Sequence, residues 1–180
     1  LQIGWAAGQG FSRYGHGRVI IGKDTRISGY LLESALEAGL SAAGMDVSLT
    51  GPLPTPGVAY LTRVSQAKAG IMISASHNPY QDNGIKFFDC NGSKLSDEVE
   101  AKIESLLGNS AITLESSKIG KAIRIDTALD RYQAFCRSTF PAGLDLNGVT
   151  IVFDGANGAG YKVGPRTLNE LGAEVITGGC

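Results

Sequence analysis

The fold is decided by residues 69–86, AGIMISASHNPYQDNGIK, in which a buried strand ends and a sharp turn begins. The first five residues form a short apolar run of the kind that makes a buried strand. Asn78 and Pro79 then mark the turn. A serine hydroxyl on such a turn is exposed at the edge of a sheet, where a substrate can reach it. Residues 85–88 bring the chain back as another strand, which carries Lys86.

Strand and helix patterns alternate on the N-terminal side of this stretch. Residues 18–22 predict a buried strand, residues 28–44 a helix, residues 47–49 a second strand, and residues 55–66 a second helix. This alternation predicts an α/β fold with a layered mixed sheet and helices on both faces.

The spacing of apolar and acidic residues along the helix at 28–44 predicts which of its sides is buried and which is exposed. Its apolar stripe consists of Leu31, Leu32, Ala35, Leu36 and Leu40. Glu33 and Glu37 are one turn apart on the same helix, and we expect them to form a solvated face.

The C-terminal part predicts the end of one domain and the opening of another. Helices are expected from Ser96 to about 108 and from about 127 to 140, with a surface loop at 109–120 between them. Residues 141–148 then read as a linker. We therefore predict a first domain over residues 1–142 and an incomplete second domain over residues 143–180.

The second unit has a simple expected order. A strand at 149–153 leads into a glycine-rich loop at 154–160, a helix to about residue 171, and a strand at 173–176. The loop, DGANGAG, does not have the Gly-x-Gly-x-x-Gly spacing of a dinucleotide site. We interpret it as a structural turn that lets strand and helix pack closely.

The composition argues against a nucleic-acid-binding protein and against a membrane-spanning one. Of 180 residues, 43% are apolar and 18% charged, and the net charge is −1, so no basic footprint for nucleic acid is expected. No apolar run is long enough to predict a membrane span. The three cysteines, Cys90, Cys136 and Cys180, are scattered without metal-ligand spacing, which indicates reduced thiols in the cytoplasm. A chain that starts at Leu1 and stops at Cys180 is expected to be a fragment.

Four residues are candidates for chemistry. Ser76 would be a weak nucleophile as a hydroxyl, but as a phosphoserine it becomes a phosphoryl donor that needs nearby cations. His77 and Lys86 are the local candidates, although in an extended chain His77 would point away from Ser76, and Lys86 could be a surface lysine. Arg26 lies in a strand-to-helix loop, where it could bind phosphate or pair with Asp24.

Several strings carry a family resemblance. SASHNP at 74–79, with NGIK at 83–86, resembles the active-site serine loop of the α-D-phosphohexomutases. Within that family, GWAAG at 4–8, GKDTRISG at 22–29 and LTGPLPTP at 49–56 look most like the bacterial phosphoglucosamine mutases. The glycine-rich loop at 154–160 is similar to the start of the family's second domain.

The resemblance implies a mechanism. A phosphoryl group on Ser76 would pass to a phosphosugar, and a bisphosphate would reorient and return its other phosphate, interconverting glucosamine 6-phosphate and glucosamine 1-phosphate on the path to UDP-N-acetylglucosamine. It implies catalytic roles for Ser76, His77 and Lys86, phosphate binding by Arg26, Mg²⁺ held partly by the Ser76 phosphate, and glucosamine or glucose 1,6-bisphosphate as activator. A homodimer is left open.

The same resemblance sets limits on this chain. The family's Asp-x-Asp-x-Asp metal loop, its sugar-recognition loop and its second phosphate loop would follow Cys180, so we expect the isolated fragment to be inactive. A phosphomannomutase or phosphoglucomutase, a non-catalytic domain of the same fold, and a phosphatase remain alternatives, because nothing in residues 1–180 identifies the sugar.

Overall fold

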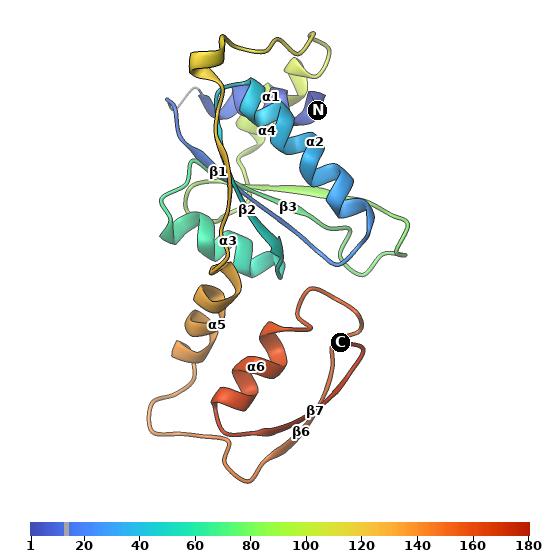
Figure 1. Ribbon diagram of the computed structural model, residues 1–180, viewed down its shortest axis with the longest axis vertical. Helices are drawn as coiled ribbons and strands as arrows, with labels where there is room; N and C mark the ends of the chain where they lie inside the picture. Colours follow the sequence, from blue (N-terminus) through green and yellow to red (C-terminus); the bar gives the residue numbers. More distant parts are fainter. Residues whose placement is uncertain (13–14) are drawn as a thin grey trace.

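A mixed five-stranded sheet lies at the centre of the computed structural model, which describes residues 1–12 and 15–180 (Figure 1). Its order is β4-β3-β1-β2-β5. All neighbouring strands are parallel except β4, which runs antiparallel to β3. The strands are β1 (Arg18–Lys23), β2 (Asp46–Pro52), β3 (Ala69–Ile73), β4 (Ile85–Phe88) and β5 (Ala122–Arg124).

Helices cover both faces of this sheet. One buried cluster joins α1, α2 and α4 to the strand side chains Val19 and Ile21, while another joins α3 and α5 to Ile20. The period of two along β1 therefore divides the core into two layers. The helices are α1 (Gln2–Ser12), α2 (Ser28–Ala42), α3 (Thr55–Val64), α4 (Asp97–Leu106) and α5 (Ala128–Ser138), with a 3₁₀ turn at Ser116–Lys118. The predicted fold class is confirmed.

Two elements were not predicted from the sequence. Helix α1 contains three glycines, which disfavour a helix locally, yet a Cβ at Gly4 would lie only 2.5 Å from the Leu36 carbonyl oxygen of α2. The helix therefore forms because its small residues permit close packing on α2. Strand β5 is only three residues long, and it exists by extending the edge of β2, where Ala122 pairs with Val47.

The expected solvated face of α2 is partly wrong. Glu33 is buried and forms an ion pair with Lys23, whose side chain is fully buried at the end of β1. The Lys23 ammonium also lies 4.2 Å from the centre of the Tyr30 ring. Leu31, assigned to the apolar stripe, is 74% exposed. Glu33 faces inward because Lys23 lies buried beneath α2, a position that no spacing pattern reveals.

A second, smaller unit follows the main sheet (Figure 1). Its parallel strands β6 (Thr150–Asp154) and β7 (Glu174–Gly178) are joined by α6 (Val163–Glu170), as the predicted strand–helix–strand order requires. Glu170 accepts hydrogen bonds from Gln133 Nε2 (2.8 Å) and Arg137 Nη1 (3.1 Å), which attach α6 to α5. The domain division at 142/143 stays a prediction.

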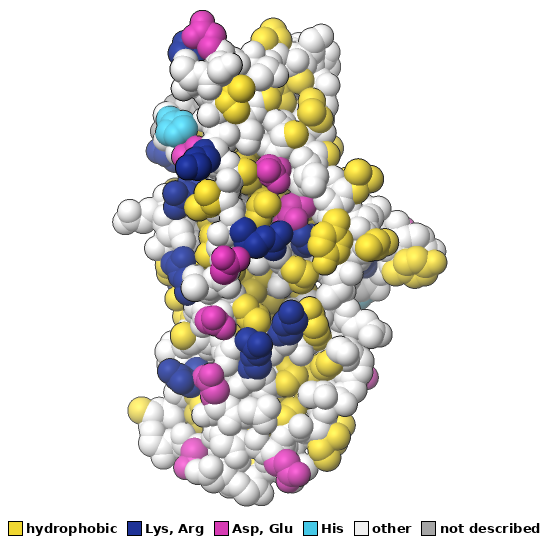
Figure 2. All heavy atoms as spheres, in the orientation of Figure 1, with side chains coloured by type: hydrophobic (Ala, Val, Ile, Leu, Met, Phe, Trp, Pro, Cys, Tyr) yellow, Lys and Arg dark blue, Asp and Glu magenta, His cyan; other side chains and the backbone are white. Residues whose placement is uncertain are grey.

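The surface is mixed in charge. Lys and Arg side chains are interspersed with Asp and Glu on the face shown in Figure 2. Within the described ranges, every helix is too short or too polar to cross a bilayer.

Candidate functional site

The candidate site lies where the carboxyl ends of β1 and β3 meet. These strands are parallel neighbours, but the chain leaves β1 toward β2 on one side and leaves β3 toward β4 on the other. Such a switch point opens a crevice outside the sheet, and ligands of α/β proteins bind there. The Asp24 amide donates to the Ile73 carbonyl (3.0 Å), which joins the two strand ends.

The segment after β3, residues 74–84, is the serine loop. Buried Ser74 accepts a hydrogen bond from the Ser76 amide through its Oγ (3.0 Å), and the Asn78 amide donates to the Ala75 carbonyl (3.1 Å). Ser76 adopts a left-handed backbone with φ of 59°, which is uncommon for a residue with a side chain. The turn predicted from Asn78 and Pro79 is present, and it exposes Ser76.

The His77 side chain lies beside that of Ser76, although the side chains of adjacent residues point apart in an extended chain. The left-handed turn brings His77 Nδ1 to 3.3 Å from Ser76 Oγ. With its proton on Nε2, the ring can accept the serine hydroxyl's hydrogen bond. The tight turn required for this contact is therefore observed, while the catalytic role of His77 stays a prediction.

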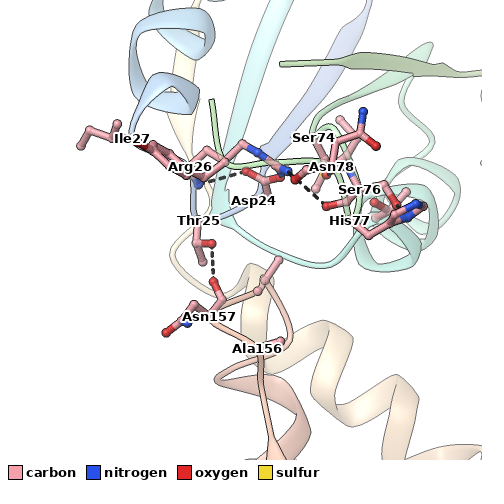
Figure 3. Close-up of a pocket in the computed structure, with 15 residues that line it drawn as sticks. Asp24, Thr25, Arg26, Ile27, Ser74, Ser76, His77, Asn78, Ala156 and Asn157 are labelled. Carbon is pink, nitrogen blue, oxygen red and sulfur yellow. Dashed lines mark hydrogen bonds and ion pairs between the residues drawn. The ribbon is translucent and has the colours of Figure 1, made fainter. Parts of the chain in front are cut away.

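Arg26 also lies beside Ser76, and it pairs with Asp24, while its phosphate-binding role stays a prediction. Its Nη1 forms an ion pair with Asp24, and its Nη2 donates to the carbonyls of Ser76 (3.2 Å) and Asn78 (2.8 Å). The Asp24 and Arg26 side chains are only 9% and 12% exposed. Figure 3 shows the guanidinium directed at the serine loop. In this structure the guanidinium donates hydrogen bonds to backbone carbonyl oxygens of that loop.

Lys86 is exposed on β4 and pairs in register with Met72 of β3. Directly opposed residues on antiparallel strands place their side chains on the same face of the sheet. Met72 lines the site cavity, whereas Lys86 is not among the lining residues. Lys86 is thus on the correct face but outside the cavity wall, and its predicted role is untested.

The Ser76, His77 and Arg26 side chains line one cavity of about 750 Å³ (Figure 3). One wall consists of the loop after β1 and the serine loop, and the other is residues 156–159 of the second unit. Thr25 Oγ1 donates to the Asn157 carbonyl (2.5 Å) across the gap. The cavity is lined by Asp24, Thr25, Arg26, Ile27, Thr55, Met72, Ser74, Ser76, His77, Asn78, Tyr80, Ala156, Asn157, Gly158 and Ala159.

The glycine-rich loop therefore does more than the structural turn expected from its sequence. Ala156 and Asn157 have left-handed backbones (φ 46° and 54°), like Ser76, and all three line the cavity. Backbone strain of this kind concentrates at functional sites. One signal was available in the sequence, because this loop, like the serine loop, directly follows the carboxyl end of a strand.

The charges on the cavity wall nearly cancel. Asp24 and Arg26 are the ionised side chains among the lining residues, and they pair with each other. Within residues 1–12 and 15–180, no group of three or more His, Cys, Asp or Glu side chains could hold a metal ion. A phosphate placed here would need further cationic partners.

Relatives match the whole chain. A phosphoglucosamine mutase from Edwardsiella ictaluri is 62% identical over 177 residues, which cover 98% of this chain. One from Pectobacterium carotovorum is 61% identical over all 180 residues. The chain spans about 40% of the length of these curated relatives.

Solved structures match the fold. A phosphoglucomutase/phosphomannomutase family protein from Burkholderia thailandensis superposes with a TM-score of 0.81 at 25% identity, covering 99% of this chain and 39% of that one. The phosphoglucomutase pp63/parafusin from Paramecium, in its open form, has a TM-score of 0.78 at 16% identity, covering 97% and 39%. This second likeness shows the fold alone.

The family model for phosphoglucomutase/phosphomannomutase, alpha/beta/alpha domain I, matches residues 1–111. This range contains β1 to β4, the loop with Arg26 and the whole serine loop. The resemblance stated from the sequence strings is confirmed, and the chain belongs to the phosphoglucomutase/phosphomannomutase family.

Proposed function

We propose that the full-length protein containing this chain is a phosphoglucosamine mutase, which interconverts glucosamine 6-phosphate and glucosamine 1-phosphate. The observation that carries this proposal is the identity of about 60% to proteins of that name over the whole chain. The exposed Ser76 in the wall of the cavity supports it, because a phosphoryl carrier must be reachable by its substrate.

Phospho-Ser76 would transfer its phosphoryl group to a hydroxyl of the sugar monophosphate. The bond between Ser76 Oγ and phosphorus breaks, a bond from the sugar oxygen to phosphorus forms, and in net the proton of the sugar hydroxyl moves to Ser76 Oγ, which becomes a hydroxyl. The bisphosphate then reorients in the site and returns its other phosphoryl group to Ser76, so the overall reaction is an isomerisation. A 1,6-bisphosphate of glucosamine or glucose would serve as activator by phosphorylating Ser76.

We assign supporting roles to His77 and Lys86. His77 Nδ1, at 3.3 Å from Ser76 Oγ, is close enough to hold a proton on that oxygen while it is not phosphorylated. Lys86, on the cavity's face of the sheet, would supply positive charge to a phosphate that enters the cavity.

Mg²⁺ is the metal that we associate with this reaction, and it would neutralise charge at the transferring phosphoryl group. The described residues alone do not fit a metal site, since they contain no cluster of suitable ligands. A phosphate on Ser76 would add a single ligand. The remaining ligands would have to come from elsewhere in the full-length protein, and no step above depends on the metal.

The test uses the full-length protein with glucosamine, glucose and mannose 6-phosphates, Mg²⁺ and an activating bisphosphate. We expect the wild-type enzyme to be most active on glucosamine 6-phosphate. Ser76→Ala should lower that activity by more than about a thousandfold, because the carrier hydroxyl is lost. Preference for glucose or mannose phosphate would favour a sister mutase of the kind named among the structural neighbours. Full activity of Ser76→Ala would refute the role of the serine.

Two further expectations accompany the proposal. The 180-residue chain alone should turn over no substrate, because it spans about 40% of the length of its curated relatives and its described residues contain no cluster of metal ligands. The reaction should take place in the cytoplasm, with which the three free thiols are consistent. Release of phosphate without any need for bisphosphate would instead indicate a phosphatase.

A further inference from the structure

We propose that Arg26, held by Asp24, is a positioning residue that fixes the backbone of the serine loop and thereby the orientation of Ser76. This inference rests on the proposed function, and it replaces the direct phosphate contact expected for Arg26 from the sequence. Arg26 thus acts through Ser76 and not on the substrate.

The first argument is how the guanidinium uses its donors. Nη2 is shared by the carbonyls of Ser76 and Asn78, and Nη1 is taken by the Asp24 carboxylate. Nε is buried without a hydrogen-bond partner in the described structure, so it is shielded from an entering phosphate. Arginine suits this task, because its planar fork holds several acceptors in fixed directions.

The second argument is where the held carbonyls lie. They belong to Ser76 and Asn78, on either side of His77, and thus span the part of the loop that contains the left-handed residue. A left-handed backbone at a non-glycine residue is disfavoured by itself and persists where its surroundings hold it. Arg26 supplies contacts that hold it, and the same turn keeps His77 Nδ1 near Ser76 Oγ.

The third argument is charge. Asp24 accepts from both the backbone amide of Arg26 (3.0 Å) and its guanidinium, and both side chains are nearly buried. A carboxylate in direct contact cancels most of the arginine's field at the cavity. The pair is therefore better suited to fixing a loop than to attracting a dianionic phosphate. Thr25, between them, attaches the same loop to Asn157 of the opposite wall.

The experiment compares Arg26→Lys and Asp24→Asn with wild type in the full-length protein. Arg131→Lys, an exposed arginine on α5 whose guanidinium makes one long hydrogen bond to Ser65 (3.4 Å), is the matched control. Amide hydrogen exchange of residues 74–84 is measured on protein without phosphate on Ser76. Steady-state kcat and KM are then measured with glucosamine 6-phosphate.

We expect Arg26→Lys to raise exchange in the serine loop at least about tenfold, because hydrogen bonds from a charged donor contribute that much or more. Its kcat should fall about a hundredfold, the scale of a misplaced reacting group. KM should stay within about threefold, since substrate binding is not removed. Asp24→Asn, which keeps the arginine, should shift exchange and kcat in the same direction, and Arg131→Lys should change neither.

Unchanged amide exchange in both variants would overturn the proposal. It would be the result expected if Arg26 only bound phosphate, because its loss would then not alter the serine loop of protein that carries no phosphate. Faster exchange with wild-type kcat would also overturn it, as would a raised KM with unchanged kcat. If Arg26→Lys does not fold, Asp24→Asn decides by the same criteria. Absence of mutase activity in the wild type would refute the proposed function, and the exchange measurement would still decide whether Arg26 holds the loop.

Discussion

The buried ion pair between Lys23 and Glu33 provides the sharpest test of how this core is held together. The Lys23 side chain is fully buried and that of Glu33 is 6% exposed; Lys23 pairs with Glu33 Oε2, and Glu33 Oε1 has no hydrogen-bond partner in the described structure. Replacing one member leaves the other as an uncompensated buried charge. Replacing both by apolar groups of similar size removes the two desolvation costs together.

We therefore expect Glu33→Leu to lower the free energy of unfolding by about 3–5 kcal/mol. For a chain of this size, that loss corresponds to a fall in the melting temperature of roughly 6–20 °C. The double variant Lys23→Met/Glu33→Leu should recover most of the loss and unfold within about 2 kcal/mol of wild type. The exposed pair of Lys118 and Glu115 is the control, because its removal should cost at most about 1 kcal/mol.

The assay is urea unfolding followed by the fluorescence of Trp5, the single tryptophan, which is 7% exposed between the packed helices. The reasoning would be refuted if Glu33→Leu cost less than about 1 kcal/mol, the value of a solvent-exposed pair. It would equally be refuted if the double variant were no more stable than Glu33→Leu, because the buried lysine would then not be the cause of the loss.

Two more predictions concern the cavity and the second core layer. Thr25→Val removes the hydroxyl that binds the Asn157 carbonyl, and we expect faster amide exchange in residues 155–160 by about fivefold, the effect of one neutral hydrogen bond, with exchange in β3 unchanged. Equal exchange in both proteins would show that this contact does not hold the loop. Burial raises the pKa of Tyr132 above its usual value of 10.0. A raised pKa means that the folded state resists loss of the proton, so stability should fall as pH rises above 10, and Tyr132→Phe should reduce that fall. Parallel pH profiles of unfolding for the two proteins would contradict this.

The sequence was most informative where local patterns and burial agree. The apolar runs of β1 and β3 and the Asn-Pro turn identified the strands and the serine loop, because these runs are too short for a typical helix and turn residues follow them. It was least informative for β5 and α1, whose own residues favour neither a strand nor a helix strongly. Those elements form because a neighbouring edge or helix surface accepts them.

The family, the fold class and the identity of the exposed serine could be predicted from the sequence, since each depends on the order of residues along the chain. The contacts of Arg26, the direction of Glu33 and the loop that completes the cavity became clear from the three-dimensional structure. Asp24, Ser76 and Asn157 lie far apart in sequence, and the ends of strands in two different sheets bring them together. Such contacts depend on strand order and on packing between helices, which no local spacing encodes.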